Sequence, residues 1–373
     1  MSKSFDLTYV FGAGRIERIN SINEQPDDFF YGYKYFEKKY KTNIIEMKFP
    51  SEKRSLKKYI DKILRKLTKL PIYLDDIATY MNYKILKSSN KILLTSELLA
   101  LSLLPFLLII KMFRKIDIYI IVMGLFGRTT PNYINKFFQF LFIRLIIFIS
   151  SNIFFLGKGE IENIGHEWIK HKHKFIFLPF SIDFDFWKVD NDYSLQNRNQ
   201  ILFIGNDGKR DYKLAQDIAS KLPEIEFTFI TAQIENENLT TKNINLIKGK
   251  WNENYISDNL IKDFYSKSRL TIVPLKESTQ PSGQSVTLQS MAAKCPVIIS
   301  KTTGFWDSDK FTNESNIVFI EDNNLEGWIN VIKKTYENGN YLKKLSHTGF
   351  NLVKDEYNLD KFNTILDSII FKE

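Results

Sequence analysis

A lysine and a run of small polar residues lie together in residues 276–285, which read KESTQPSGQS. Apolar residues recur with helical spacing directly after this segment, so its end is expected to form a helix N-terminus. Backbone N–H groups are unpaired there and the helix dipole is positive, so a phosphate would bind well, and Lys276 would add a full charge. The residues placed at this N-terminus are Ser282, Gly283, Gln284 and Ser285. The alternative is structural: a serine that caps the helix and a glycine that turns the chain.

The elements around this loop are expected to form one strand–helix–strand unit. Residues 271–275 are apolar and mostly β-branched, which predicts a buried strand, and Pro281 and Gly283 interrupt the polar loop that follows. The apolar spacing from Gln284 onwards predicts a short helix, and residues 297–300 predict the next buried strand. In such a unit the loop lies at the carboxyl edge of a parallel sheet, where open α/β sheets bind ligands.

Residues 281–300, PSGQSVTLQSMAAKCPVIIS, resemble the donor-nucleotide unit of retaining glycosyltransferases of the GT-B fold, family 4. That family usually carries two glutamates in this loop and helix, separated by seven residues. The matching positions here hold Pro281 and Gln289, so both acids are missing. An amide at Gln289 can still hydrogen-bond ribose hydroxyls, whereas Pro281 cannot replace a carboxylate that touches the sugar. The PSGQSVTLQSMA form is similar to that of a subgroup of family 4.

A second basic loop is expected at the start of the second domain. Residues 201–204 predict a strand, and GNDGKRDY follows as a loop that leads into a helix. The family resemblance implies that this loop clamps the donor diphosphate with a basic pair, for which Lys209 and Arg210 are the candidates. Arg210 is the stronger candidate because its planar guanidinium matches phosphate oxygens. Taken alone, the pair could be two surface charges at a turn. The resemblance also implies that Asn206 and Gln289 orient the donor.

A glycine-rich turn, Gly12-Ala13-Gly14-Arg15, follows the strand predicted for residues 6–11. Such a turn lets the backbone approach a ligand closely, although the third glycine of the dinucleotide fingerprint is missing. The family resemblance places this turn at the cleft and makes Gly12 and Gly14 donor-binding candidates. A tight turn with a solvated arginine is the alternative. The nearby aromatic stretch of residues 27–33 is expected to be ordinary core and rim.

Length and composition predict a two-domain α/β protein. The chain has 373 residues, of which 44% are apolar and 25% charged, as in soluble globular proteins. Its single cysteine, Cys295, excludes an internal disulfide and fits a reducing compartment, and no signal peptide is expected. The family resemblance implies the GT-B architecture, in which two Rossmann-like domains face each other across a cleft. The predicted boundaries are 1–182 for the acceptor-side domain, 183–200 for a linker, 201–354 for the nucleotide-sugar domain, and 355–373 for a C-terminal helix that braces the first domain.

Positive charge is concentrated in the first half of the chain. Residues 1–190 hold 30 Lys and Arg against 19 Asp and Glu, an excess of +11, whereas residues 191–373 carry −2. Residues 51–69 predict a basic amphipathic helix, which either lies on an anionic membrane surface or packs its apolar stripe on the first sheet. The second interpretation is favoured. Residues 137–148 predict an apolar helix that can dip into an interface, and no transmembrane span is expected.

The family resemblance implies a retaining glycosyltransferase that transfers a sugar from a nucleotide-diphosphate donor to a hydroxyl group. The acceptor would be a glycan or lipid-linked acceptor of bacterial-type surface glycan synthesis. The family resemblance implies that no divalent metal is needed, because the basic residues and the helix N-terminus would stabilise the leaving diphosphate. The histidines His166, His171 and His173 lack a ligand pattern. No catalytic acid or base can be named.

The protein is expected in the cytoplasm, at the inner face of the cytoplasmic membrane if the basic domain binds there. Two other function classes stay open. A non-catalytic nucleotide-sugar or glycan-binding GT-B protein is the main alternative, because both family glutamates are missing. A nucleic-acid-binding protein ranks well below, because aromatic and basic residues do not interleave.

Overall fold

The computed structural model of the chain describes residues 4–21, 25–50, 55–128, 130, 132–189, 198–239, 241–249 and 256–371. The chain divides into two compact units. Unit 1 comprises Met1–Glu24, Phe29–Leu178 and Asn363–Glu373, and unit 2 comprises Gln25–Asp28 and Pro179–Phe362. Residues 190–197 of the predicted linker, and Lys53 and Arg54 of the predicted basic helix, lie outside the described residues.

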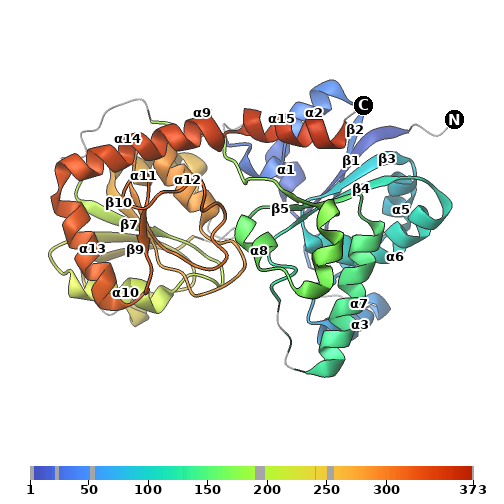
Figure 1. Ribbon diagram of the computed structural model, residues 1–373, viewed down its shortest axis with the longest axis horizontal. Coiled ribbons are helices and arrows are strands. Elements are labelled where there is room, and N and C mark those ends of the chain that lie inside the picture. The colour runs from blue at the N-terminus through green and yellow to red at the C-terminus, as the bar shows by residue number, and fades with distance from the viewer. Residues whose placement is uncertain are drawn as a thin grey trace. The chain divides into compact units, whose positions relative to one another are not determined.

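Unit 1 is built on a six-stranded parallel sheet with the strand order β2-β1-β3-β4-β5-β6 (Figure 1). The order reverses between β1 and β3, so the loops after these two strands diverge at the carboxyl edge of the sheet. The last five residues of β1 are fully buried, as expected for a parallel strand that is covered on both faces. The strands are β1 (Phe5–Phe11), β2 (Thr42–Glu46), β3 (Ser89–Leu94), β4 (Asp117–Val122), β5 (Asn152–Phe155) and β6 (Phe175–Phe177).

The helices of unit 1 follow the strands in alternation. α5 packs on β3, α6 packs on both β3 and β4, and α3 packs on α7. The helices are α1 (Arg15–Ile19), α2 (Tyr33–Lys39), α3 (Leu56–Thr68), α4 (Leu74–Ile77), α5 (Tyr80–Lys87), α6 (Glu97–Phe113), α7 (Tyr133–Ile149), α8 (Lys158–Glu162) and the 3-10 helix η2 (His166–Lys174). The final helix, α15 (Leu359–Ile370), contributes its residues from Asn363 onwards to this unit. There Asp367 accepts hydrogen bonds from the hydroxyl groups of Tyr35 (2.8 Å) and Tyr40 (2.9 Å).

Unit 2 contains a second six-stranded parallel sheet, with the order β12-β11-β10-β7-β8-β9. Numbered within the unit, this order is 6-5-4-1-2-3, the doubly wound arrangement of dinucleotide-binding folds. The strands are β7 (Gln200–Ile204), β8 (Glu226–Ile230), β9 (Ile244–Ile247), β10 (Ser268–Val273), β11 (Val297–Ser300) and β12 (Val318–Ile320). The helices are α9 (Phe184–Trp187), α10 (Tyr212–Lys221), α11 (Asp258–Lys267), α12 (Gln284–Ala292), α13 (Leu325–Glu337) and α14 (Gly339–Glu356).

Most predicted elements are confirmed. The helix that was predicted from Gln284 is α12, and the strand predicted for 297–300 is β11. The apolar helix predicted for residues 137–148 is part of α7, which spans Tyr133–Ile149. The C-terminal helix predicted for residues 355–373 is corrected at its start: α14 ends at Glu356 and α15 begins at Leu359, so two helices meet there. The aromatic stretch of residues 27–33 is mainly core, as predicted, with Phe30, Tyr31 and Tyr33 all buried.

The favoured interpretation of the basic amphipathic helix is wrong for most of its apolar stripe. Leu64 packs against the core of unit 1, but α3 otherwise buries Asp61 and Thr68 and turns the rest of the stripe outward. Asp61 accepts hydrogen bonds from the backbone N–H groups of Leu74 (2.8 Å) and Asp75 (3.2 Å), which fixes the rotation of the helix. The exposed fractions of the stripe are 76% for Leu56, 64% for Tyr59, 40% for Ile60 and 41% for Ile63.

Two long apolar runs of the sequence form α6 and α7. Each helix has 17 residues, fewer than the roughly 20 of a typical bilayer-spanning helix, and each contains buried polar residues such as Glu97 and Gln139. Among the described residues, none of the helices combines the length and the apolar character that a membrane crossing requires.

Candidate functional site

The two basic loops predicted from the sequence meet at the carboxyl edge of the unit 2 sheet. One loop follows β7 and the other follows β10, and these two strands are neighbours at the point where the strand order reverses. Residues Arg210 and Leu275 pair across the loops as an isolated antiparallel bridge. The N–H of Lys276 donates to the carbonyl of Lys209 at 2.8 Å. Ligands of open α/β sheets bind at this kind of position.

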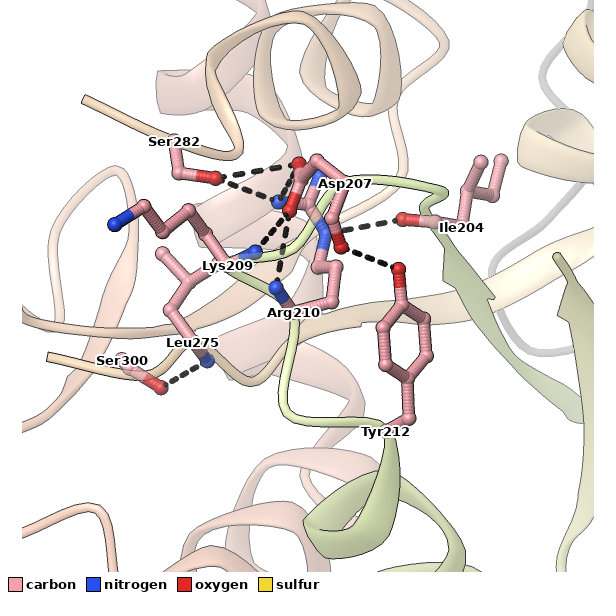
Figure 2. A network of polar contacts seen from close by, with 8 residues as sticks. All are labelled: Ile204, Asp207, Lys209, Arg210, Tyr212, Leu275, Ser282 and Ser300. Atoms are coloured by element: carbon pink, nitrogen blue, oxygen red, sulfur yellow. Dashed lines mark hydrogen bonds and ion pairs between the residues drawn. The ribbon is translucent and has the colours of Figure 1, made fainter. Parts of the chain in front are cut away.

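Arg210 is the centre of the cluster (Figure 2). Its side chain is only 3% exposed, and Nε donates to the carbonyl oxygen of Ile204 at 3.2 Å. Nη1 donates to Asp207 Oδ2 at 2.9 Å and to Ser282 Oγ at 3.0 Å. Among the described residues, Nη2 has no hydrogen-bond acceptor. The guanidinium is therefore fixed by three partners and keeps two N–H groups for a ligand.

Asp207 organises the loop around Arg210. Its Oδ1 accepts hydrogen bonds from the backbone N–H groups of Lys209 (2.8 Å) and Arg210 (3.0 Å), and its carbonyl accepts one from the Tyr212 hydroxyl (2.6 Å). A Cβ atom at Gly205 would lie 2.6 Å from Cγ of Arg210, so only glycine leaves room for the arginine to fold back. The family resemblance pointed to the basic pair but not to Asp207.

The second loop is held by side chains from neighbouring strands. Ser300, at the end of β11, accepts the N–H of Leu275 at 2.8 Å and donates to Asn323 Oδ1 at 2.6 Å. Asn323 returns a hydrogen bond from Nδ2 to the Leu275 carbonyl at 2.8 Å. Buried, satisfied networks of this kind rigidify a loop, so the Arg210 and Ser282 side chains are positioned before any ligand arrives.

The N-terminus of α12 completes the cluster. Gly283 occupies the N-cap position with φ of 83°, where a side chain would be strained and would meet Val273. It offers no side-chain cap, so the first N–H groups of a helix of nine residues lack the usual capping acceptor. Ser285 is half-buried and Gln284 buried in the first turn, while Lys276 is exposed on the adjoining loop. A helix N-terminus beside a buried arginine favours an anion.

Gln289 lies further along α12, in a buried polar network of unit 2. Its Nε2 donates to Asp28 Oδ2 at 2.9 Å, and its Oε1 accepts from the hydroxyl of Tyr265 at 3.3 Å. Asp28 also accepts from the indole N–H of Trp187 at 2.8 Å and the backbone N–H of Asp183 at 2.6 Å. An amide suits this position, because a glutamate would face a second carboxylate with no donor between them.

The comparisons with known proteins give a fold but no sequence family. No protein-family model matches the chain, and no curated protein matches it. Sucrose-phosphate synthase from Thermosynechococcus elongatus is similar over 98% of both chains, with a TM-score of 0.70 and 10% identity. The Anabaena protein HepE, in complex with UDP-glucose, is similar over 98% of this chain and 99% of that one, with a TM-score of 0.66 and 9% identity. A glycosyltransferase from Rickettsia africae matches over 100% of both chains, with a TM-score of 0.64 and 14% identity. The chain has the GT-B fold.

Asn206, the other residue predicted to orient a ligand, ties together three loops of this GT-B chain. Its Nδ2 donates to the carbonyl of Gly249 at 2.8 Å, and its Oδ1 accepts from the N–H of Ala232 at 2.7 Å and the hydroxyl of Thr231 at 3.2 Å. The amide therefore shapes the edge of the sheet, and its contact with a donor stays a prediction.

Gly12 and Gly14 belong to unit 1 and follow β1 of its GT-B sheet. No atom lies within 4 Å of a Cβ built at Gly12, while Gly14 adopts a φ of 82° as the N-cap of α1. The turn is thus open on the Gly12 side and needs glycine for its conformation at Gly14. The predicted role of both residues in donor binding stays a prediction.

Metal-binding side chains do not cluster in the part of this GT-B chain that the structure describes. Its residues contain no group of three or more His, Cys, Asp or Glu side chains placed to hold a metal ion. His166, His171 and His173 lie on η2, the lysine-rich 3-10 helix of unit 1.

Burial raises the pKa of Asp28 to about 7, although its three hydrogen bonds oppose the shift. An unfolded chain ionises this carboxyl near its ordinary pKa of about 3.9. Since the pKa is raised on folding, the stability that the group contributes is complete below pH 4 and is lost as the pH rises through 7.

Asp28→Asn removes this titration. We expect the stability advantage of the wild type over Asp28→Asn to shrink between pH 5 and pH 8 in urea unfolding. An advantage that is constant or grows with pH would contradict the assignment.

Proposed function

We propose that the protein is a glycosyltransferase whose donor is a nucleotide-diphosphate sugar bound at the carboxyl edge of the unit 2 sheet. The observation that carries the proposal is the buried Arg210 guanidinium, held by Asp207 and Ser282 beside the uncapped N-terminus of α12. The fold supports it, since one similar structure holds UDP-glucose and another is a sucrose-phosphate synthase.

The chemistry of this reaction depends on the leaving group. As the bond from the sugar to the diphosphate breaks, negative charge grows on the phosphate oxygens, and preorganised cations and N–H groups stabilise it. Arg210 would supply the central contact, with Lys209, Lys276 and the N–H groups from Gly283 to Ser285 around it. These groups would take the place of a divalent metal. We assign no acid or base residue, and a front-face retaining mechanism requires none from the protein.

Donor orientation is assigned to the remaining predicted residues. Gln289 keeps one N–H of its amide and would reach a ribose hydroxyl with it, while Asp28 and Tyr265 hold the side chain. Asn206 would act through the loop that it shapes. Gly12 and Gly14 would allow the backbone to approach a bound ligand closely.

Product analysis tests the reaction directly. The full chain is incubated with UDP-, GDP- and ADP-sugars and a set of alcohol and glycan acceptors, and the new glycosidic bond is examined by NMR. A product with the same anomeric configuration as the donor supports retaining transfer. An inverted product excludes retention. Tight binding of a nucleotide sugar with neither transfer nor hydrolysis would favour the non-catalytic alternative.

The surface of unit 1 suggests where the acceptor lies. Of the 18 large apolar side chains that are exposed among the described residues, 17 belong to unit 1, the more basic half of the chain. On α7 the exposed side chains include Tyr133 (91%), Phe137 (62%) and Phe148 (61%). Apolar side chains that gather into one exposed patch mark an interaction site.

Two packed helices carry much of this surface, and we call it the α3–α7 face. α3 lies beside α7 (Figure 1), and Asn135 of α7 donates from Nδ2 to the carbonyl oxygens of Lys66 (2.8 Å) and Leu67 (2.6 Å). Lysines flank the outward apolar stripe of α3: Lys57, Lys58, Lys62, Lys66 and Lys69. An apolar stripe bordered by lysines matches the interface of an anionic membrane. We therefore propose peripheral binding of unit 1 to such a membrane, where a lipid-linked acceptor for surface glycan synthesis would be found.

Liposome flotation tests the membrane proposal. The full chain is expected to float with anionic vesicles at low salt and to be released at high salt, because each lysine near the surface adds about 1 kcal/mol. The double variant Ile60→Glu/Ile63→Glu should bind several-fold more weakly, since it places charge in the apolar stripe. Leu260→Glu is the matched control, as Leu260 is 45% exposed but lies in unit 2. Binding that ignores lipid charge and salt, or equal loss in the control, would contradict the proposal.

A further inference from the structure

A cavity of about 250 Å³ opens in unit 1 and shares no residue with the loops of unit 2 described above. It lies between the loop that follows β4, the first half of α7 and the start of η2. A water molecule takes about 30 Å³, and pockets for drug-sized ligands usually start near 300 Å³, so this cavity has room for one small ring. The residues that matter for its chemistry are Arg128, Lys136, Gln139, Phe140, Glu167 and Trp168.

Gln139 gives the clearest sign of a ligand. Its side chain is only 7% exposed, and Nε2 is buried without a hydrogen-bond partner among the described residues. A buried amide donor without an acceptor is costly, so native structures rarely keep one without a purpose. Because Gln139 lines the cavity, a ligand oxygen would satisfy it there.

Two buried carboxylates shape the loop that brings Arg128 to the cavity. Glu160 accepts the N–H groups of Gly124 (2.8 Å) and Phe126 (3.1 Å). Glu97 accepts the N–H of Met123 at 3.1 Å with one oxygen and pairs with Arg128 Nη2 at 3.3 Å with the other. The arginine is therefore held in place rather than free in solvent, and the site is built by the core of the unit.

The walls combine aromatic rings with donors. Phe140 and Trp168 stack on each other at 4.8 Å between ring centroids, and Trp168 is only 4% exposed. Lys136 is exposed and has no ion pair with any residue that the structure describes. Three side chains that donate hydrogen bonds line the cavity, namely Arg128, Lys136 and Gln139. The carboxylate of Glu167 is an acceptor, so donors are in excess. Aromatic walls suit the apolar face of a sugar ring, and an excess of donors suits a ligand rich in acceptor oxygens.

We propose that this cavity binds one sugar unit that carries an anionic group, a carboxylate or a phosphate, as part of the glycosyl acceptor. The sugar ring lies against the aromatic wall, the anionic group faces Arg128 and Lys136, and Gln139 Nε2 donates to a ring or hydroxyl oxygen. The acceptor role rests on the proposed glycosyltransferase function, whereas the binding itself does not.

Binding of simple probes to the full chain tests the site. Glucuronate, glucose and inorganic phosphate are titrated separately by NMR, in parallel with UDP, GDP and ADP. Glucuronate is expected to bind more tightly than glucose or phosphate. Gln139→Leu should weaken glucuronate binding about three- to tenfold, the effect of losing one hydrogen bond to a neutral oxygen. The same variant should raise the melting temperature of the free protein, because it removes an unsatisfied buried donor. Gln216→Leu, in unit 2, is the matched control and should leave glucuronate binding unchanged.

The outcomes separate this site from the proposed function. If phosphate binds as tightly as glucuronate, the cavity is an anion site and the proposal is overturned. If Gln139→Leu binds glucuronate as tightly as the wild type does, the proposal is overturned as well. If no sugar binds while a nucleoside diphosphate does, the cavity proposal fails and the proposed function stands. If glucuronate binds in the Gln139-dependent way and no diphosphate binds, the sugar site stands and the proposed function fails.

Discussion

Replacing Arg210 with alanine is expected to weaken nucleoside diphosphate binding by about 1.5–3 kcal/mol, the value of a hydrogen bond to a charged group. Transfer should slow by at least the same factor, because the contact strengthens as charge grows on the leaving diphosphate. The structural reason is the position of the guanidinium, which Asp207, Ser282 and the Ile204 carbonyl hold still while Nη2 remains available. Calorimetric titration with the diphosphate measures the first effect, and steady-state kinetics measures the second.

Two further variants test whether the effect is specific to the guanidinium of Arg210. Lys213→Ala removes an exposed cation of the same unit that pairs with Asp217, and it should change neither quantity. Arg210→Lys keeps the charge but loses the planar fork, so it should recover only part of the affinity. Donor affinity and turnover that stay at wild-type values in Arg210→Ala would remove Arg210 from the site.

The change Gln289→Glu is expected to destabilise the protein most at neutral and alkaline pH. It replaces the amide that donates to Asp28 at 2.9 Å with a second buried carboxylate. Leaving an uncompensated charge in such a place costs about 3–5 kcal/mol, and the pair would take up a proton instead where the pH permits. The folded-state pKa of the pair is raised, so the loss of stability should be small near pH 5 and grow as the pH rises through 7. Urea unfolding at both pH values measures it.

A compensating change makes the Gln289→Glu experiment sharper. Asp28→Asn combined with Gln289→Glu restores one donor and one acceptor across the same contact, and should regain part of the stability lost at pH 8. The regain should be partial, because Trp187 and the Asp183 backbone also donate to residue 28. A Gln289→Glu variant as stable as the wild type at pH 8 would show that the Asp28 contact does not hold in solution.

Local sequence patterns were sufficient for most of the fold. The predicted bounds of α12 and β11 agree with the structure because a proline and a glycine limit the segment and apolar residues keep a clear period. The basic pair after β7 was named through the family resemblance, because taken alone it could equally be two surface charges at a turn, and its role in donor binding stays a prediction. α14 was not predicted, although it spans 18 residues from Gly339 to Glu356.

Two features depended on tertiary contacts that no local pattern contains. Asp28 and Gln289 are 261 positions apart, so their hydrogen bond, and with it the reason for an amide at 289, became apparent only in the structure. α3 has an obvious apolar stripe, and a periodic pattern favours burial of that stripe. The buried hydrogen bonds of Asp61 instead set the rotation of the helix and leave most of the stripe, from Leu56 to Ile63, in solvent.

The most direct test of the proposed donor site is a calorimetric titration of the full chain with UDP, GDP and ADP and with the corresponding monophosphates, in buffer that contains EDTA. We expect one diphosphate to bind without a divalent metal, and to bind more tightly than its monophosphate, since Arg210 and the N-terminus of α12 bind the second phosphate. Binding of none of the diphosphates, or equal affinity for the diphosphate and the monophosphate, would contradict the proposed donor site.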